Sequence, residues 1–392
     1  MEPADVVLRF LESVGKRSEA DFYLSLFRAE PKERFAAISV DANVARHATD
    51  AVSLDLRFLA TLGLFPVVLL GLFDSKEAAE HATRIKKRLE TGGVPATILE
   101  GEGEALHEAA IRATRSETIP IVPMVPASGD PEGPLTHAHI DERFGRLSKL
   151  LSAMQTRKLI FLHRPGGLRQ GGKLIPNIDL TSDYEALSHS RDLSRKERVI
   201  LAQSRRLVLE TVTHKLLVTV SSPLDLLREL FTVKGAGTLL RRGAIIQKHD
   251  GFPTIDRDRM RALLTSSFGR PPDDAFFERP ASAIYLEESY RGAAVLRSTA
   301  LGPYLTKFAV GNEAQGEGIG SDLWRRLLAE CPRFFWRARP TNPIDAWYVK
   351  QCDGMARCGE WNIFWKGMDP IYLPSAIAYA LGQPIDIPPA VE

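Results

Sequence analysis

Short apolar runs alternate with amphipathic stretches over the first 245 residues of the chain. The runs are almost wholly apolar, which is typical of strands buried on both faces of a parallel sheet. Amphipathic stretches with N-terminal capping residues lie at residues 75–90 and 194–213 and predict helices. The pattern therefore predicts an α/β fold in which helices cover a parallel sheet. The strand candidates are residues 35–40, 66–70, 119–124, 158–162 and 215–220.

A different pattern occupies residues 309–324, where an apolar strand leads through closely spaced glycines into an amphipathic helix. Gly316, Gly318 and Gly320 carry no side chain, so backbone N–H groups can converge on an anion at the helix N-terminus. The segment has neither the Lys-Ser/Thr ending of a Walker A loop nor the Gly-x-Gly-x-x-Gly spacing of a dinucleotide fold. It predicts a phosphate-binding loop, with a plain glycine turn as the alternative.

The sequence from Gln315 resembles the Gln/Arg-x-x-Gly-x-Gly/Ala pyrophosphate loop of the GNAT superfamily of N-acetyltransferases, which bind acetyl-CoA. Farther on, Phe-Trp-Arg-x-Arg, Thr-Asn-Pro-Ile, Trp-Tyr and Asp-Gly follow in order within residues 334–354. Together they resemble the acetyltransferase domain of N-acetylglutamate synthases of the vertebrate type and of bifunctional bacterial synthase/kinases. This resemblance spans roughly residues 250–370.

The first part of the chain resembles the amino acid kinase fold of acetylglutamate kinases. The resemblance lies in Pro165-Gly-Gly-Leu, in residues 177–184 and in residues 229–243. It implies an amino acid kinase-like parallel-sheet sandwich at residues 1–245, followed by a GNAT-superfamily α+β domain at residues 246–392. The expected boundary lies in a polar connection with a Gly-Phe-Pro turn.

Kinase chemistry is expected to be lost. Ser39-Val-Asp-Ala-Asn stands where kinases of this fold have Lys-x-Gly-Gly. Leu70-Gly-Leu-Phe-Asp stands in place of a His-Gly-x-Gly-Pro loop, and residues 137–142 stand in place of an Asn-Ala-Asp region. Phosphoryl transfer depends on neutralising negative oxygens, which these residues do not offer. The family resemblance implies a role in assembly, as a dimer or tetramer, and an arginine effector site near residues 229–237. A simple glycine turn is the alternative for that segment.

The resemblance also implies how acetyl-CoA is held. The pantetheine arm would pair with the backbone of Phe308, Ala309 and Val310, and the pyrophosphate would lie on the loop. Glu317 is expected to point to solvent, because it would otherwise repel the phosphates. The loop residues are Gln315, Gly316, Gly318, Ile319 and Gly320.

A glutamate acceptor presents two carboxylates, which guanidinium groups bind through paired hydrogen bonds. Arg337 and Arg339 alternate with apolar residues on a predicted strand, so both should face the same side. Lys307 adds a cation from the neighbouring strand. The resemblance implies that these residues bind substrate, with Arg339 the weakest match; surface ion pairing is the alternative.

For proton transfer, the resemblance points to Tyr348 as the acid that protonates the departing thiolate, since a tyrosine with a pKa near ~10 is protonated at neutral pH. Asn342 would orient the amine or polarise the acetyl carbonyl. Trp347 is expected to pack. No histidine of this region is placed to act as the base, so water or a relay is expected. Cys352 has no partner histidine, which favours direct transfer over a covalent intermediate.

Length, composition and charge bear on the number of domains and on the classes of ligand and compartment that are expected. The chain has 392 residues, enough for two domains, and a net charge of +2 gives no case for nucleic acid or a membrane surface. The first residues lack a secretory signal, and the apolar run at residues 62–73 is too short to span a bilayer, so a cytoplasmic protein is expected. The three cysteines form no metal pair. No metal is expected, although His137 and His139 would share a face if they lay in a strand.

The sequence thus predicts an acetyl-CoA:L-glutamate N-acetyltransferase, the first enzyme of arginine biosynthesis. Two alternatives stay open: an acetyltransferase for another amino acid or a protein lysine, and a catalytically weak regulatory or sensor protein. Lys307 and Arg337 favour a small acidic acceptor.

Overall fold

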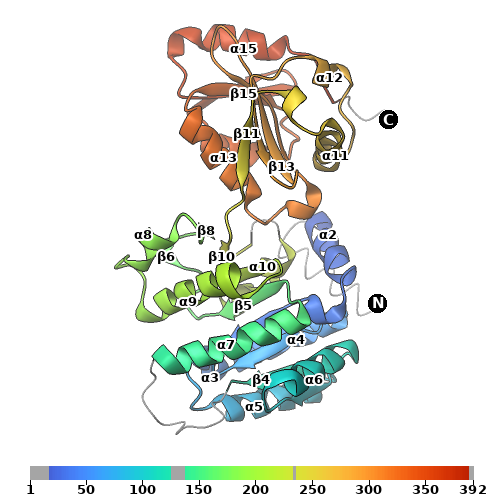
Figure 1. Cartoon of the computed structure of the whole chain (residues 1–392), viewed down its shortest axis with the longest axis vertical. Helices are drawn as coiled ribbons and strands as arrows, with labels where there is room; N and C mark the ends of the chain where they lie inside the picture. The colour runs from blue at the N-terminus through green and yellow to red at the C-terminus, as the bar shows by residue number, and fades with distance from the viewer. Residues whose placement is uncertain (1–16, 125–136, 233–234, 388–392) are drawn as a thin grey trace. The chain divides into compact units, whose positions relative to one another are not determined.

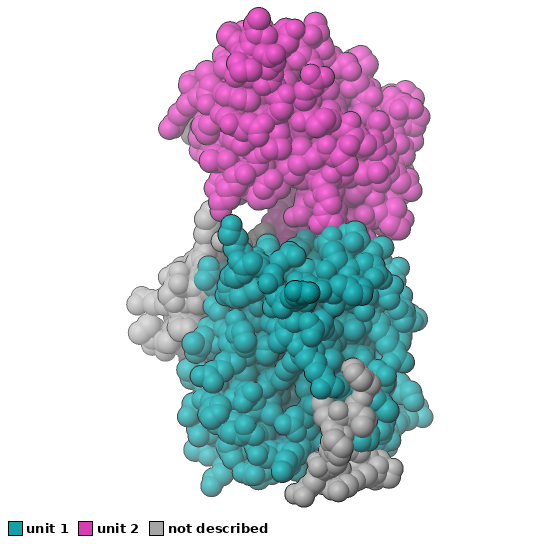
Figure 2. Space-filling model, turned by 90° about the vertical axis from the view of Figure 1, so that its left-hand side faces the viewer, with its two compact units in different colours: residues 1–242 teal, residues 243–392 magenta. Residues whose placement is uncertain are grey.

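The computed structural model describes residues 17–124, 137–232 and 235–387. The chain divides into two compact units, Met1–Arg242 (unit 1) and Gly243–Glu392 (unit 2), which Figure 2 colours separately. Each unit is built around its own β-sheet (Figure 1).

Within its described residues, unit 1 contains an eight-stranded sheet in which all neighbouring strands are parallel except β9 and β10. The five apolar runs are confirmed as strands of this sheet, although their ends shift by up to two residues. In sheet order the strands are β3 (Ala96–Ile98), β4 (Ile119–Pro123), β2 (Val67–Leu70), β1 (Ala37–Val40), β5 (Lys158–Leu162), β9 (Leu217–Ser221), β10 (Thr238–Arg241) and β8 (Asn177–Asp179). A small hairpin, β6 (Arg169–Gln170) and β7 (Lys173–Leu174), lies apart from it.

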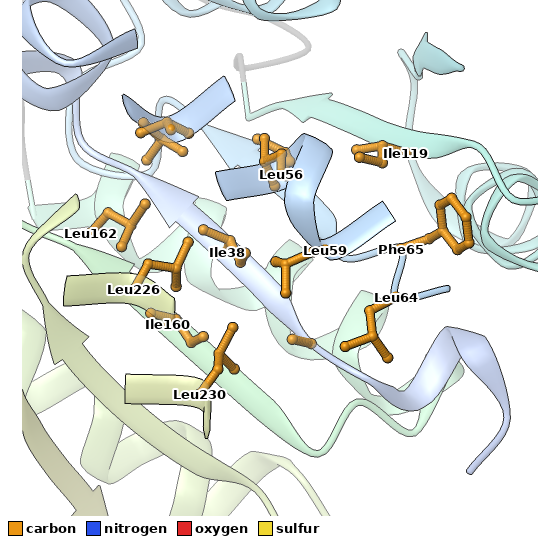
Figure 3. Close-up of a cluster of buried hydrophobic side chains, with 14 of the residues drawn as sticks. Ile38, Leu56, Leu59, Leu64, Phe65, Ile119, Ile160, Leu162, Leu226 and Leu230 are labelled. Atoms are coloured by element: carbon orange, nitrogen blue, oxygen red, sulfur yellow. The ribbon is translucent and has the colours of Figure 1, made fainter. Parts of the chain in front are cut away.

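The strands of unit 1 are apolar throughout because both faces of the sheet are covered. Along β1, Ala37 belongs to one buried cluster, whereas Ile38 and Val40 belong to the other. Figure 3 shows the second cluster, where side chains of α4 and α10 gather over Ile38. The helices on that side are α2 (Arg17–Arg28), α3 (Ala42–His47), α4 (Thr49–Thr61), α5 (Ala78–Thr91) and α10 (Leu226–Phe231); on the other side are α6 (Gly103–Arg115), α7 (His137–Met154), α8 (Tyr184–Ser188) and α9 (Arg195–Arg206).

Both predicted helices of unit 1 form, but only one has the expected cap. Helix α9 begins with a complete capping box between Ser194 and Glu197 and ends in a π-turn, Leu207–Thr211. Helix α5 begins at Ala78 without a side-chain cap, later than predicted. The hydroxyl of Ser75 is buried and accepts a hydrogen bond from Arg143 Nη2 at 3.1 Å, and Asp74 Oδ1 accepts one from the N–H of Lys76 at 3.1 Å in the turn before the helix.

Unit 2 has a seven-stranded sheet among its described residues, antiparallel except where β14 meets β15. In sheet order the strands are β11 (Ile246–His249), β12 (Ala283–Glu287), β13 (Gly292–Arg297), β14 (Tyr304–Val310), β15 (Phe334–Ala338), β17 (Trp361–Lys366) and β16 (Gly354–Cys358). One face packs against α13 (Ile319–Glu330) and α14 (Asp345–Gln351), and the other against α11 (Arg257–Phe268), α12 (Ala275–Glu278) and α15 (Leu373–Leu381). The predicted α+β character is confirmed.

In the part of the chain that the structure describes, no helix is both long and apolar enough to cross a membrane. The apolar run at residues 62–73 contains β2, as predicted.

Candidate active site

The sheet of unit 2 opens between β14 and β15. Over their described lengths, these strands pair only at Tyr304 with Phe335 and at Leu305 with Trp336. On its other side β14 carries a bulge: Leu305 pairs with Leu296 and Lys307 with Val295, which leaves Thr306 as an extra residue. A bulge bends and twists its strand. The backbone of β14 beyond the bulge is therefore available to pair with an extended ligand.

The glycine loop lies at the far end of this opening. Gly316 and Gly318 have φ angles of 79° and 81°, a left-handed conformation that favours glycine. Gly320 lies in the first turn of α13, where an added Cβ would be 3.5 Å from Val310 Cγ2. The first turn of α13 is therefore in direct contact with the end of β14, so the structure brings the predicted loop and strand together.

The N-terminus of α13 has the features of an anion site. Gly318 is the N-cap and provides no side-chain cap, while Ile319 is buried and anchors the turn. The N–H groups of a first helical turn have no acceptor within the helix, and the macrodipole favours negative charge there. Gln315 donates from Nε2 to Asn312 Oδ1 at 2.9 Å and so fixes the approach to the helix.

The expectation that Glu317 points to solvent is wrong. Its side chain is only 15% exposed, and its Oε2 lies 3.1 Å from Arg291 Nη1. Arg291 also pairs with Glu287 at 2.6 Å. Arg291 is shared by two carboxylates, so it offsets only part of the repulsion between Glu317 and a bound anion.

Tyr348 lies in a buried aromatic cluster on the α13 face of the sheet. Its ring centroid is 6.4 Å from that of Phe308 and 5.5 Å from that of Trp336. Burial, with a smaller effect of Asp345, raises the pKa of Tyr348 above its ordinary value. Trp347 stacks on Phe308 at 5.7 Å. Both aromatic residues thus pack against the strand predicted to bind acetyl-CoA, and Tyr348 keeps its proton at neutral pH.

Asn342 forms the turn that starts α14. Its Oδ1 accepts a hydrogen bond from the N–H of Ile344 at 3.2 Å, and its own N–H donates to the carbonyl oxygen of Arg339 at 2.9 Å. The side-chain oxygen is therefore used to hold the turn. The amide nitrogen of Asn342 is the side-chain atom left to donate to a ligand.

Lys307 and Arg337 lie on the opposite face of the sheet from Tyr348. Lys307 Nζ lies 5.1 Å from the ring centre of Phe276, and the guanidinium of Arg337 lies 4.0 Å from that of Trp361. Arg339 lies over the same indole at 4.9 Å, so the alternation does place both arginines on one side. Arg339 also pairs with Glu360 at 3.1 Å.

Sequence reasoning missed the partners of these cations. Lys307 Nζ lies 2.6 Å from Asp386 Oδ2, and Asp386 also contacts Arg279. Burial lowers the pKa of Lys307, and Asp386 opposes this shift. No local pattern identifies Asp386, because it follows the last helix and meets residues far away in the sequence.

In unit 1, a charged cluster lies at the carboxyl ends of β1 and β5, the edge at which parallel sheets bind ligands. Asp41 directly follows β1 and is buried against Lys196, and His163 Nδ1 is 3.8 Å from Asp41 Oδ2. Burial lowers the pKa of Lys196 to about 8. Asp41 thus lies in the segment that stands where the resembling kinases have Lys-x-Gly-Gly, and Ser39 takes the place of the lysine.

The described residues contain no group of three or more His, Cys, Asp or Glu that could hold a metal ion. The strand considered for His137 and His139 is wrong: both lie in α7, where residues two apart do not share a face. The cysteines are free, and burial raises the pKa of the Cys352 thiol, which opposes its use as a nucleophile.

The loop geometry yields a stability prediction. We expect Gly318→Ala to lower the free energy of unfolding by about 1–2 kcal/mol, because an alanine is strained at positive φ. Gly320→Ala is the matched control: it lies in helical conformation, and its Cβ would make ordinary contacts. Urea unfolding of both variants provides the measurement. Equal stability of the two variants would contradict the left-handed conformation at Gly318.

Comparison with known proteins places these features in a family. A family model described as "NAT, N-acetyltransferase, of N-acetylglutamate synthase" matches residues 246–377. A Xylella fastidiosa protein named acetylglutamate kinase is 31% identical over 405 residues, covering 91% of this chain and 95% of the relative. The mitochondrial N-acetylglutamate synthase of Danio rerio is 29% identical, covering 93% of this chain and 77% of the relative.

A solved structure shares the fold. N-acetylglutamate synthase from Neisseria gonorrhoeae, complexed with coenzyme A and L-arginine, is 16% identical and superposes with a TM-score of 0.51. The match covers 89% of this chain and 97% of that chain. The chain therefore belongs to the N-acetylglutamate synthase family of the vertebrate-like and synthase-kinase type, in which an amino acid kinase-like domain precedes a GNAT-superfamily acetyltransferase domain.

Proposed function

We propose that this protein transfers an acetyl group from acetyl-CoA to the α-amine of L-glutamate, the first step of arginine biosynthesis. The observation that carries the proposal is the opening between β14 and β15. It ends at a glycine-lined helix N-terminus and has a buried tyrosine on one face and basic side chains on the other. A thioester placed in the opening would lie between the tyrosine and the basic side chains.

Acetyl-CoA would lie along β14. Its pyrophosphate would accept hydrogen bonds from the first-turn N–H groups of α13, where Gly316 and Gly318 leave the backbone uncovered. The pantetheine would pair with the exposed backbone of Phe308, Ala309 and Val310, as a further strand pairs with a sheet edge. The coenzyme A complex of the Neisseria gonorrhoeae enzyme, which shares this fold, supports the assignment.

Glutamate would bind on the opposite face through its carboxylates. Arg337 offers a planar guanidinium that lies 4.0 Å from the ring centre of Trp361, and Lys307 offers an ammonium from the bulged strand. Arg339 lies 4.9 Å from the same ring centre, is 36% exposed and is paired with Glu360. This placement gives Arg337 and Lys307 the larger share of carboxylate binding.

The amine nitrogen attacks the thioester carbon, and the carbon–sulfur bond then breaks. Tyr348 would give its proton to the departing thiolate, while the amide of Asn342 would orient the amine or polarise the acetyl oxygen. The raised pKa of Tyr348 keeps its proton available at neutral pH. The proton of the glutamate ammonium would leave through water or a relay. The high thiol pKa of Cys352 is consistent with direct transfer.

Residues 1–245 would serve assembly and regulation as a degenerate kinase-like domain, in a homodimer or homotetramer. Ser39 stands at the position of the phosphate-binding lysine, so we expect no acetylglutamate phosphorylation despite the name of the Xylella fastidiosa relative. The candidate arginine segment is residues 229–237. Within it, Glu229 Oε2 accepts hydrogen bonds from the N–H groups of Ala236 and Gly237 at 2.8 and 3.0 Å. The L-arginine complex of the Neisseria gonorrhoeae enzyme supports arginine as an effector.

The assay is release of coenzyme A from acetyl-CoA by the purified protein. We expect a rate that depends on glutamate and that is much lower with glutamine, which has the same shape but lacks the second carboxylate. Equal rates with and without glutamate would contradict the proposal. Equal rates with glutamate and glutamine would instead indicate an acetyltransferase for other amino acids.

A further inference from the structure

The C-terminal segment, residues 380–387, contacts both side chains assigned to the acceptor. Arg337 donates from Nη1 to the carbonyl oxygen of Ala380 and from Nη2 to that of Pro384, each at 2.8 Å. Lys307 Nζ donates to Asp386 Oδ2 at 2.6 Å. The segment therefore lies where the carboxylates of an acceptor are expected.

Asp386 is held as a bound carboxylate would be. Its side chain is 4% exposed, Oδ1 contacts Arg279, and Oδ2 accepts from Lys307 and from the hydroxyl of Thr306 at 3.4 Å. Burial opposes the charge of Asp386, but Lys307 and Arg279 lower the pKa of its carboxyl below the usual range. Charge-assisted hydrogen bonds to both oxygens are the way proteins recognise carboxylate ligands.

The cluster has more positive charge and more donors than one aspartate uses. Arg297 is 8% exposed. Burial lowers the pKa values of Arg297, Lys307 and Arg337, and the charge of Asp386 opposes this shift at all three. Among the described residues, Arg297 Nε and Arg279 Nη1 are buried and have no hydrogen-bond partner. Unpartnered buried donors are costly, so the cluster favours a ligand with additional acceptors.

We propose that Arg279 and Arg297 complete, with Lys307, a subsite for one carboxylate of the acceptor, and that Asp386 occupies this subsite until the acceptor displaces it. The proposal rests on the proposed function, because it takes the acceptor to be a dicarboxylic amino acid. An aspartate side chain ends in the same group as glutamate. A tethered carboxylate of this kind competes with the acceptor, and its presence lowers the apparent affinity by the fraction of sites it fills.

The first experiment compares Asp386→Asn with the unaltered protein. We expect the KM for glutamate to fall by about fivefold or more with little change in kcat, because the internal competitor is weakened. Glu278→Gln removes the same charge from an exposed position on α12 beside Arg279 and should leave the KM unchanged. Asp386→Glu restores the carboxylate and should bring the KM back toward its original value. A KM that rises or stays the same in Asp386→Asn would overturn the proposal.

A second experiment uses binding of glutarate, which has two carboxylates and no amine. Calorimetry should show tighter glutarate binding by Asp386→Asn than by the unaltered protein; equal binding would overturn the proposal. If glutamate supports no turnover but glutarate still binds more tightly to the variant, the proposed function fails while the carboxylate subsite stands.

A third measurement needs no variant and therefore does not depend on the folding of Asp386→Asn. Saturating glutarate should speed hydrogen exchange at the amide of Asp273 in the unaltered protein, because this amide donates to the carbonyl oxygen of Asp386 at 2.9 Å and loses its acceptor when the segment is displaced. Unchanged or slower exchange would overturn the proposal.

Discussion

Replacing Tyr348 with phenylalanine is expected to lower kcat by about 100-fold or more and to leave the KM for glutamate nearly unchanged. General acid catalysis contributes about 10²–10⁴ in rate, and the variant lacks only the hydroxyl that would protonate the thiolate. The ring keeps its contacts with Phe308, Trp336 and Phe364, so the fold should be preserved. Steady-state kinetics with varied glutamate separates the two constants.

Tyr372→Phe is the matched control, because Tyr372 is exposed and lies outside the aromatic cluster. It should retain full activity. If Tyr348→Phe also kept a kcat close to that of the unaltered protein, Tyr348 would be a packing residue and another group would have to protonate the thiolate.

Arg337→Ala is expected to raise the KM for glutamate by about 10- to 100-fold with a smaller effect on kcat. Hydrogen bonds to charged groups contribute about 1.5–3 kcal/mol, and alanine removes the guanidinium proposed to bind one carboxylate of glutamate. The variant also loses contacts with Trp361 and with the carbonyl oxygen of Pro384, so its unfolding transition should be measured alongside its kinetics.

Arg339→Ala provides the comparison on the same indole. Arg339 is half-exposed and already paired with Glu360, so its removal should raise the KM much less. A larger effect for Arg339 than for Arg337 would reverse their assigned roles. An effect on kcat alone for Arg337 would contradict its role in binding glutamate.

The sequence was informative about the fold because burial leaves a local pattern. Strands covered on both faces, such as β1 and β5, read as continuous apolar runs, and the capping box of α9 is visible as Ser194 and Glu197. Helix α5 was predicted to start too early: residues 74–77 form a turn before it, and the hydroxyl of Ser75 bonds to a distant side chain, Arg143. A cap can be recognised from sequence only when its partners are local.

In the candidate site too, local patterns predicted the placement of some residues, whereas contacts with distant residues were missed. The glycine loop and the alternation of Arg337 and Arg339 follow from local sequence, and the structure places them as expected. The orientation of Glu317 was wrong because its partner, Arg291, comes from another strand end. The contact between Asp386 and Lys307 joins residues from the C-terminal segment and β14, and no periodicity reports such a pair. The catalytic and binding roles of individual residues were inferred from the family resemblance. The kinetic experiments on Tyr348, Arg337 and Arg339 test these roles.

The most direct test of the account is a crystal structure of the protein with coenzyme A. We predict that the pyrophosphate lies against the first-turn N–H groups of α13 and that the pantetheine pairs with β14 beyond Thr306. The sulfur should then lie in the opening between β14 and β15, next to Tyr348. Coenzyme A bound elsewhere, or an opening closed by continued pairing of β14 with β15, would contradict the account.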